Sequence, residues 1–414
     1  MGEPGVDYGD IEAALARLDD PSVVRETPVD RSTTLEGKTG AASVRLKMEH
    51  LQWTGSFKPR GAYNTVAKRL EEGDLDHVVA ASAGNHAQGV ALAATTLGVD
   101  STIVMPKTAP QAKVEATRGY GASVELVGRD FQAAMEFARE LVAETDAEFI
   151  HAFDDPAIVA GQGTLGVEMC EDAPDIDTVI VPIGGGGLIS GVATAFAEHS
   201  PGTRIVGVQA EGAATVADSL AKGEPITLDS VDTIADGIAT GGVSGLTLGI
   251  IDRHVDEVVT VTNGEIADAI LLLMERAKQV VEGAGAASVA ALLCGDLDVT
   301  GKSVMPLLCG GNLDMTMLRT VLIHALTRRE QIIRLRVRIR DEPGKMDELS
   351  GIISDQGANI HAVRHDRAID DLDIGEAYLV FEVETGGADH AGRVVDAIAG
   401  RDYDVAVVNR APSS

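Results

Sequence analysis

Aromatic residues are scarce in this chain, since Phe, Trp and Tyr make up only 3% of its 414 residues. Hydrophobic residues still account for 45% of it, so large cores have to be built from Val, Ile, Leu and Ala. A chain of this length predicts about two or three domains. The composition is therefore that of a globular protein with aliphatic cores.

Cysteine is also rare, with Cys170, Cys294 and Cys309 far apart in the chain. An odd number of widely spaced cysteines argues against a disulfide framework and favours a reducing compartment. The first ten residues lack the basic start and apolar run of a signal peptide. No stretch reaches the roughly 20 apolar residues that span a bilayer. We therefore expect a cytoplasmic protein without a membrane partner.

Positive charge is the third scarcity: 34 Lys and Arg face 64 Asp and Glu, for a net charge of −30. A surface this acidic repels phosphate backbones and anionic lipids, which excludes nucleic acid as an expected partner. The acidic excess is spread along the chain, as in proteins of salt-loving organisms; an ordinary acidic cytosolic enzyme is the alternative. Only 10 of the 34 basic residues are lysines, which draws attention to any lysine within a motif.

Lys58 lies in the segment TGSFKPRGA, Thr54 to Ala62. Pro59 fits the first turn of a helix, which Thr54 or Ser56 can cap. Gly55 and Gly61 are expected to leave room for a bulky group beside the backbone. Most lone lysines are solvated surface charges. A lysine on a tight strand-to-helix turn can instead form a Schiff base with a carbonyl cofactor.

Short apolar strands alternate with helices through most of the chain. The pattern predicts strands at segments such as HVVAAS, STIVMP and EFIHA. A second series of alternating strands and helices begins at DTVIVPIGGGG. This alternation predicts an α/β fold with two parallel-sheet subdomains and a site at the carboxyl ends of the strands. Apolar residues on one face predict a helix from Asn263 to Val281.

The tail changes character near Arg328. Apolar residues and arginines alternate from Ile333 to Arg340, the period of a half-buried strand. The remaining segments complete a βαββαβ order, which predicts a ferredoxin-like α+β unit.

Two predicted turns have residues that suit the binding of an anionic group. Gly184 to Gly187 follow an apolar strand and precede a helix, where backbone N–H groups suit a phosphate. Two alternatives remain: a tight turn without a ligand, or a dinucleotide site, since Gly185, Gly187 and Gly191 resemble its spacing and Glu211 ends the next strand. The other turn, Ser82 to His86, has two interpretations. It is a helix cap, or its backbone N–H groups bind a substrate carboxylate.

Five blocks now carry a resemblance: S-F-K-x-R-G-A, S-A-G-N-H-A-Q-G, G-G-G-G-L, E-G-A-G-A and C-G-G-N. In this order they resemble the pyridoxal-phosphate enzymes of the tryptophan-synthase-β type, among them the threonine/serine dehydratases. The resemblance covers about residues 8 to 325. It implies PLP fold type II and pyridoxal 5'-phosphate as the cofactor.

The resemblance also implies roles for single residues. Lys58 is the Schiff-base lysine and the catalytic base, and Asn85 contacts the pyridine 3-oxygen. Cys309 lies beside the pyridine nitrogen, which a thiol cannot protonate as an aspartic acid would, and this favours prompt elimination. The resemblance places Glu282 near the ring; the alternative is that Glu282 is an exposed glutamate at a helix end. The expected phosphate cradle is Gly184, Gly185, Gly186, Gly187 and Leu188; the expected carboxylate site is Ser82, Ala83, Gly84, Asn85 and His86, with the His86 ring itself structural.

The activity implied is deamination of threonine, with serine as a second substrate, to the 2-oxo acid and ammonia. For threonine this acid is 2-oxobutanoate, in isoleucine biosynthesis. Ala83 replaces a serine that related racemases use on the far face of the ring, so elimination without racemisation is expected. Two alternatives remain, a nicotinamide-dependent oxidoreductase and a non-catalytic amino-acid sensor. No residue is assigned to a metal.

The tail resembles an ACT domain through D-x-P-G followed by G-A-N-I. We expect a catalytic domain at 1–327, with a small subdomain at about 54–152, and a regulatory domain at 328–414. The resemblance implies pairing into a homo-oligomer, a dimer or tetramer, and an amino-acid effector, expected to be isoleucine with valine opposing it. The expected effector residues are Asp341, Gly344, Asn359 and Ile360.

Salt dependence follows from the net charge of −30. Like-charge repulsion destabilises the compact state until ions screen it, and the Debye length falls to ~3 Å at 1 M salt. Activity and melting temperature are therefore expected to rise from dilute buffer toward molar salt. Equal values of both in dilute and in molar salt would contradict this prediction.

Overall fold

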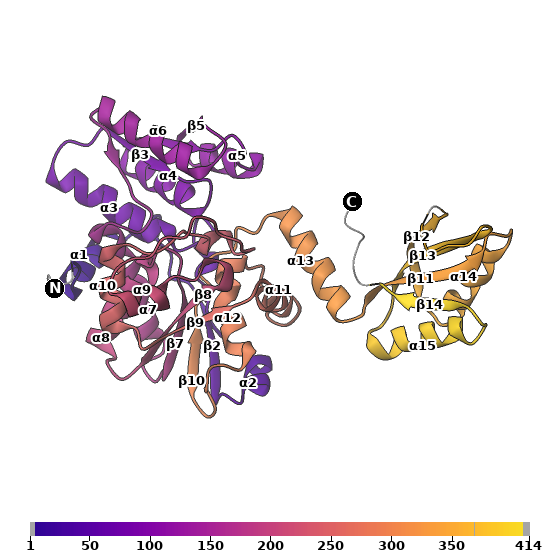
Figure 1. Cartoon of the computed structure of the whole chain (residues 1–414). Coiled ribbons are helices and arrows are strands. Elements are labelled where there is room, and N and C mark those ends of the chain that lie inside the picture. The colour runs from indigo at the N-terminus through magenta and orange to yellow at the C-terminus, as the bar shows by residue number, and fades with distance from the viewer. Residues whose placement is uncertain (1–4, 368, 409–414) are drawn as a thin grey trace. The chain divides into compact units, whose positions relative to one another are not determined.

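Parallel strands joined by helices form most of the chain (Figure 1). The computed structural model describes residues 5–367 and 369–408. It divides into two compact units, Met1–Asp314 and Met315–Ser414. Within the described residues no helix is both long and apolar enough to cross a membrane.

A six-stranded sheet organises the first unit. Its order is β1 (Val29–Arg31), β2 (Ser43–Lys47), β10 (Ser303–Pro306), β7 (Thr178–Pro182), β8 (Arg204–Ala210) and β9 (Glu257–Val261). All neighbours are parallel except β1 with β2. The central strand β7 is buried along its whole length, as expected for a parallel sheet covered on both faces.

Helices cover this sheet in two groups, with the strands between them (Figure 1). The first group is α1 (Tyr8–Arg17), α7 (Pro156–Asp172), α8 (Gly187–His199) and α10 (Gly245–His254). The second is α2 (Thr33–Thr39), α11 (Asn263–Leu272) and α12 (Gly283–Cys294). Helix α9 (Val216–Lys222) follows β8, and the short turns are η1 (Glu49–Leu51), η2 (Glu211–Ala213), η3 (Asp236–Ile238) and η4 (Leu273–Ala277).

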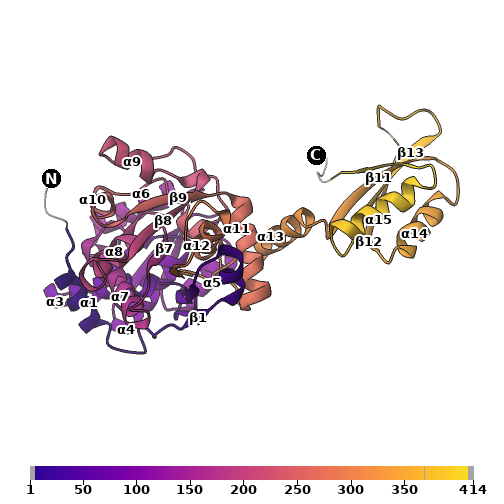
Figure 2. The same cartoon turned by 90° about the horizontal axis from the view of Figure 1, so that it is seen from below.

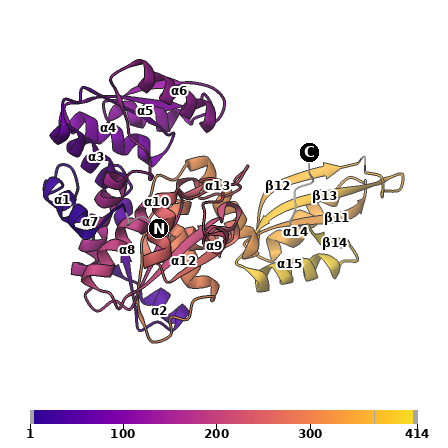
Figure 3. The same cartoon turned by 60° about the vertical axis from the view of Figure 1, so that its left-hand side comes forward.

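A smaller four-stranded parallel sheet forms a lobe of the same unit. Its order is β5 (Ser123–Leu126), β4 (Asp100–Met105), β3 (His77–Ala81) and β6 (Glu148–Phe149). Its helices are α3 (Lys58–Glu72), α4 (Asn85–Leu97), α5 (Gln111–Gly119) and α6 (Phe131–Glu144). Figure 3 shows α3 to α6 gathered on one side of the unit. The two parallel sheets confirm the predicted fold class.

The second unit has the predicted ferredoxin-like order. Helix α13 (Met315–Arg328) precedes β11 (Ile332–Arg340), α14 (Lys345–Asp355), β12 (Asn359–Asp366), β13 (Glu376–Glu384), α15 (Ala388–Ala399) and β14 (Asp404–Val407). The antiparallel sheet runs β12-β13-β11-β14. Along β11 buried Ile, Leu and Val alternate with Arg, as the period-2 pattern predicted. Helices α14 and α15 lie side by side over the buried face (Figure 2).

One predicted helix is wrong in its length. The helix expected from Asn263 to Val281 ends as α11 at Leu272, and a π-helical turn, η4, follows. Lys278 then adopts a left-handed conformation with φ 58°. The chain turns away so that the Glu282 N–H can donate to the Gly310 carbonyl at 3.1 Å. A contact with a distant strand end therefore overrides the local helical pattern.

Candidate active site

Lys58 begins helix α3, with Pro59 in its first turn as the sequence predicted. Its Nζ donates to the Ala152 carbonyl at 3.0 Å and lies 4.9 Å from the centre of the Phe57 ring. Burial lowers the pKa of the amine to about 8, although Cys309 and Glu282 raise it. A substantial fraction of the amine is therefore uncharged near pH 8, the form that acts as a nucleophile.

The glycines around Lys58 serve a different purpose from the one expected. A Cβ on Gly55 would lie 2.5 Å from Asn312 Oδ1, and one on Gly61 would lie 2.3 Å from Gln162 Nε2. A Cβ on Gly89 would lie 3.0 Å from the Lys58 Cβ. The expectation that Gly55 and Gly61 leave room for a ligand is wrong, because packing of the protein itself fills that space.

The loop from Ser82 to His86 joins β3 to α4. Ser82 Oγ accepts from the Gly84 N–H at 3.1 Å, and Asn85 opens the helix, so N–H groups of its first turn have no intrahelical partner. The Asn85 amide donates to Glu282 Oε1 at 2.7 Å. Ala83 is half-buried beside it. N–H groups without an intrahelical partner at this helix start suit an anionic group.

His86 is buried, and its Nε2 donates to the Ile150 carbonyl at 2.9 Å. Burial lowers the pKa of its ring to about 3, so the ring is neutral at ordinary pH. Both observations favour the structural interpretation of this side chain.

The glycine loop follows β7 and ends at the first turn of α8. Gly186 has φ 90°, a conformation that favours glycine, and a Cβ on Gly185 would lie 2.2 Å from the Phe153 ring. The N–H groups of Gly187 and Leu188 belong to the first turn of a 13-residue helix. This is the arrangement in which a helix N-terminus binds a phosphate.

Glu282 and Cys309 lie together near Lys58. Burial raises the pKa of Glu282 to about 7, while the hydrogen bond from Asn85 lowers it. A Cβ on Gly310 would lie 2.2 Å from Glu282 Oε1, so glycine is required there. Burial, and after it the charge of Glu282, raise the pKa of the Cys309 thiol, which is therefore neutral. The Phe57 N–H donates to the Cys309 carbonyl at 3.2 Å, which ties this strand end to the Lys58 loop.

Sequence reasoning missed the role of Asn312, although its block C-G-G-N had been recognised. Its Nδ2 donates to the Thr54 carbonyl at 2.7 Å and to Asn85 Oδ1 at 2.8 Å. Since Asn85 Oδ1 accepts this bond, the Asn85 NH2 group points toward Glu282. Asn312 therefore fixes the orientation of the Asn85 amide, a long-range contact that no local pattern signals.

The segment 151–153 was also missed, because its sequence reads as the end of a strand. His151 Nδ1 accepts from the Asp154 N–H at 2.7 Å, which turns the chain after β6. Ala152 then meets Lys58, and Phe153 packs on Gly185. This segment connects the lysine to the glycine loop, so the separate sequence motifs converge on one place.

Polar atoms near Lys58 also suit a bound group. Ser56 Oγ and Thr54 Oγ1 are buried, and within residues 5–367 and 369–408 neither has a hydrogen-bond partner. A buried hydroxyl without a partner costs free energy. A nucleophilic amine and a phosphate cradle beside them fit a small carbonyl compound that carries a phosphate.

Comparisons with known proteins agree with this geometry. The family described as pyridoxal-phosphate dependent enzyme matches residues 22–310. The chain belongs to this family. Its cofactor is pyridoxal phosphate, which decides against the nicotinamide alternative. The dinucleotide-like spacing at Gly185 therefore does not mark a nicotinamide site.

Relatives with known names cover more than three quarters of the chain. An L-threonine ammonia-lyase of Thermotoga maritima is 44% identical over 399 residues, 96% of this chain and 98% of the relative. Threonine deaminase isoform 2 of Solanum lycopersicum matches with a TM-score of 0.72 and 38% identity, over 77% of this chain and 88% of that one. Maize serine racemase matches with a TM-score of 0.71 and 35% identity, over 79% of this chain and 99% of that one.

The protonation of Glu282 predicts a pH dependence of stability. Its pKa in the folded protein lies above the ordinary value of 4.5, so its stabilising contribution is complete below pH 4.5 and is lost as pH rises to about 7. In the cofactor-free protein, the melting temperature of the wild type minus that of Glu282→Gln is expected to fall over this range and to level off above it.

The control for this measurement is Glu140→Gln, which changes an exposed glutamate of α6. Its melting temperature is expected to follow the wild type at every pH. A constant difference between the wild type and Glu282→Gln from pH 4.5 to pH 8 would show that Glu282 titrates normally.

Proposed function

We propose that this protein is a threonine ammonia-lyase that deaminates L-threonine to 2-oxobutanoate and ammonia, with L-serine as a possible second substrate. The observation that carries the proposal is the identity of 44% to a named L-threonine ammonia-lyase along 96% of the chain. The buried Lys58 amine supports it, since it has the chemistry that such a reaction requires.

The chemistry of each side chain or backbone group in the site suggests which part of the cofactor it would contact. Lys58 Nζ would hold the carbonyl carbon, and the N–H groups of Gly184, Gly185, Gly186, Gly187 and Leu188 would hold the phosphate. Asn85, Glu282 and Cys309 would lie around the ring. When bound, pyridoxal phosphate supplies the electron sink that makes loss of the α-proton of the substrate feasible. The neutral Cys309 thiol keeps the ring nitrogen free of a strong acid partner.

Lys58 also serves as the base. In its free form the Lys58 amine has a pKa lowered to about 8, near the working range of a general base, and this free amine would take the α-proton of threonine. The loop from Ser82 to His86 orients the substrate through its exposed N–H groups, which hold the carboxylate. Loss of the β-hydroxyl and hydrolysis then give one molecule each of 2-oxobutanoate and ammonia, with no net consumption of water.

The first test of this proposal is Lys58→Ala. The variant is expected to lose both the yellow absorption of the protein-bound cofactor and the formation of 2-oxo acid from threonine, because Lys58 is assigned both roles. Lys68→Ala, a half-buried lysine on the same helix, is the control and should keep both.

Two results would contradict the assignment. Colour and turnover that survive in Lys58→Ala would mean that another lysine carries the cofactor. A wild-type protein that binds threonine but forms no 2-oxo acid would favour the amino-acid sensor.

The second test concerns Ala83. Its methyl group has no exchangeable proton, so no group at this position can return a proton to the far face of the substrate. Incubation with L-serine is expected to give 2-oxo acid without D-serine, as measured by chiral chromatography. Ala83→Ser should increase the yield of D-serine relative to 2-oxo acid. D-serine formed by the wild type at a rate near that of elimination would contradict the prediction.

For the tail we propose regulation by an amino acid. A depression of about 460 Å³ opens where β11 leads into α14. Asp341 accepts from Arg367 Nε at 2.6 Å inside it, and this contact lowers the pKa of the Asp341 carboxyl. Gly344 caps α14 with φ 93° in the same depression. The carboxylate can receive an ammonium group, and the start of α14 can receive a carboxylate.

Two of the expected effector residues, Asn359 and Ile360, lie at the other end of β12. Asn359 Nδ2 donates to Glu384 Oε2 at 3.4 Å, and neither residue lines the depression. Pairing of two copies through the edge strands β12 and β14 would bring such separated groups together and cover the edges. We therefore propose a homo-oligomer, with a catalytic domain at 1–327 and a regulatory domain at 328–414.

The third test is a titration of isoleucine against the intact enzyme at sub-saturating threonine. Isoleucine is expected to lower the rate and valine to oppose it. Asn359→Ala should keep the rate without isoleucine and lose the response. A flat titration of the wild type would leave the tail with a role in assembly alone.

A further inference from the structure

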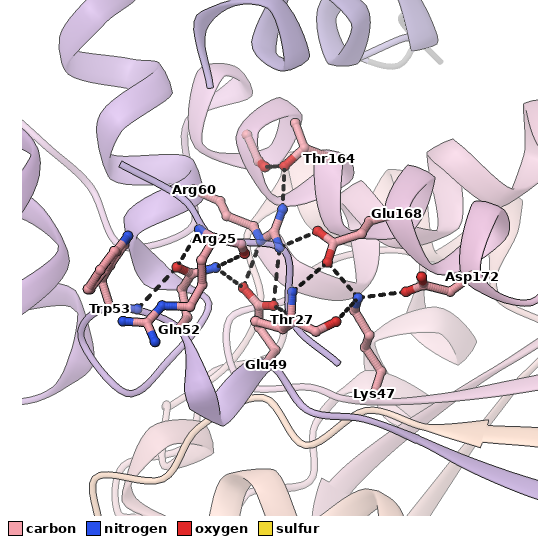
Figure 4. Close-up of polar contacts among 11 residues, drawn as sticks. Arg25, Thr27, Lys47, Glu49, Gln52, Trp53, Arg60, Thr164, Glu168 and Asp172 are labelled. Carbon is pink, nitrogen blue, oxygen red and sulfur yellow. Dashed lines mark hydrogen bonds and ion pairs between the residues drawn. The ribbon is translucent and has the colours of Figure 1, made fainter. Parts of the chain in front are cut away.

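A buried group of charges lies beneath the start of helix α3 (Figure 4). Its centre is Arg60, whose side chain is 3% exposed. Arg60 Nε donates to Glu49 Oε1 at 2.7 Å and its Nη2 donates to Glu49 Oε2 at 3.2 Å. The same Nη2 donates to Glu168 Oε2 at 2.5 Å, and Nη1 donates to Thr164 Oγ1 at 3.3 Å. All of these contacts hold one guanidinium in one orientation.

A second buried cation extends the group. Lys47 Nζ donates to Glu168 Oε1 at 2.5 Å, to Asp172 Oδ2 at 2.8 Å and to the Thr27 carbonyl at 2.8 Å. Glu168 therefore bridges Arg60 and Lys47, and despite its burial these two cations lower its pKa. Two cations and three carboxylates thus form one connected network.

The network joins four separate elements at the base of the candidate active site. Lys47 ends β2, Glu49 follows it in η1, and Glu168 lies on α7, while Arg60 belongs to α3. The backbones of α3 and α7 also come very close, because a Cβ on Gly161 would lie 2.6 Å from the Arg60 carbonyl oxygen. The first turn of α3 is therefore fixed in distance by the glycine contact and in rotation by the Arg60 ion pairs.

Arg60 follows Lys58 by two positions. Residues two apart on a helix differ by about 200° around its axis, so they point to opposite sides. When Arg60 is drawn toward Glu49 and Glu168, Lys58 is turned to the opposite side, where its Nζ reaches the Ala152 carbonyl. Paired apolar residues could fill this volume without the cost of burying charges. Apolar residues, however, could not make the directional contacts by which Glu49 and Glu168 hold Arg60.

We propose that Arg60, held by Glu49 and Glu168, is a positioning residue for Lys58: it sets the rotation of the first turn of α3 and so the place of the Lys58 amine. The inference rests on the proposed function of Lys58. It assigns to the network a role in catalysis in addition to its role in stability.

The test compares Arg60→Lys with Glu71→Gln. Arg60→Lys keeps the charge but loses the two-pronged contact with Glu49. Glu71→Gln breaks an ion pair with Arg17 at 2.8 Å, at the far end of the same helix, where Glu71 is half exposed. Both variants are first shown to be folded by their melting curves. Since Arg60→Lys can fail to fold, Glu49→Gln, which keeps the shape and an acceptor oxygen, is measured beside it.

Two measurements follow. The first is kcat and KM for threonine, where misplacement of the amine is expected to lower kcat by about a hundredfold with KM nearly unchanged. The second is the pH dependence of Lys58 acetylation by acetic anhydride in the cofactor-free protein. A displaced amine is less buried, so its pKa should rise from about 8 toward its ordinary value of 10.5. Glu49→Gln should show both effects more weakly, and Glu71→Gln neither.

The outcomes separate this inference from the proposed function. If folded Arg60→Lys and Glu49→Gln keep the wild-type kcat and acetylation profile, the network serves stability alone and the inference is wrong. If the wild type forms no 2-oxo acid, the proposed function fails, and the acetylation profile still decides whether Arg60 places the Lys58 amine. A fall in kcat without any change in that profile would also overturn the inference.

Discussion

The burial of one amine is the constraint on which the rest of the first unit depends. Lys58 Nζ has its pKa lowered to about 8 by loss of water. An ammonium group in such a place is costly unless it is paired, and the hydrogen bond of Lys58 Nζ goes to the neutral carbonyl of Ala152. The surrounding protein must therefore be packed closely enough to keep water out. The contact of Gly89 with the Lys58 backbone and the closure of the loop by Asn312 achieve this.

Around this amine the other ionisable groups also shift toward their neutral forms. Burial raises the pKa of Glu282 to about 7, raises that of Cys309 and lowers that of His86 to about 3. The site is therefore poor in fixed charge. Full charges are instead paired one layer below, around Arg60 and Lys47. A site of this kind favours a ligand that brings its own negative charge, such as a phosphate or a carboxylate, to the helix N-termini of α4 and α8.

Local rules predicted the positions that single segments decide. Pro59 placed Lys58 at a helix start, Asn85 opened α4 as expected, and the alternation along β11 gave a half-buried strand. Contacts between distant segments were not predictable in this way. Asn312 orients Asn85 across 227 positions, and the pairing of Arg60 with Glu168 spans 108. No periodicity or cap signal encodes such pairs, and the same limit explains why the small residues Gly55 and Gly61 were misinterpreted.

The open face of the tail sheet shows how charge restricts assembly. Its helices cover one face, so the arginines of β11 lie on the other. There Arg334 pairs with Glu382 at 3.1 Å, and Arg336 lies 4.6 Å from the centre of the Tyr378 ring. A face of paired charges has little to gain from burial against a second sheet, because both sets of charges would lose water. The backbone groups on the outer sides of the edge strands β12 and β14 are uncharged, and they gain hydrogen bonds when another strand pairs with them. Edge pairing with a second copy would therefore cost less desolvation free energy than burial of the charged face.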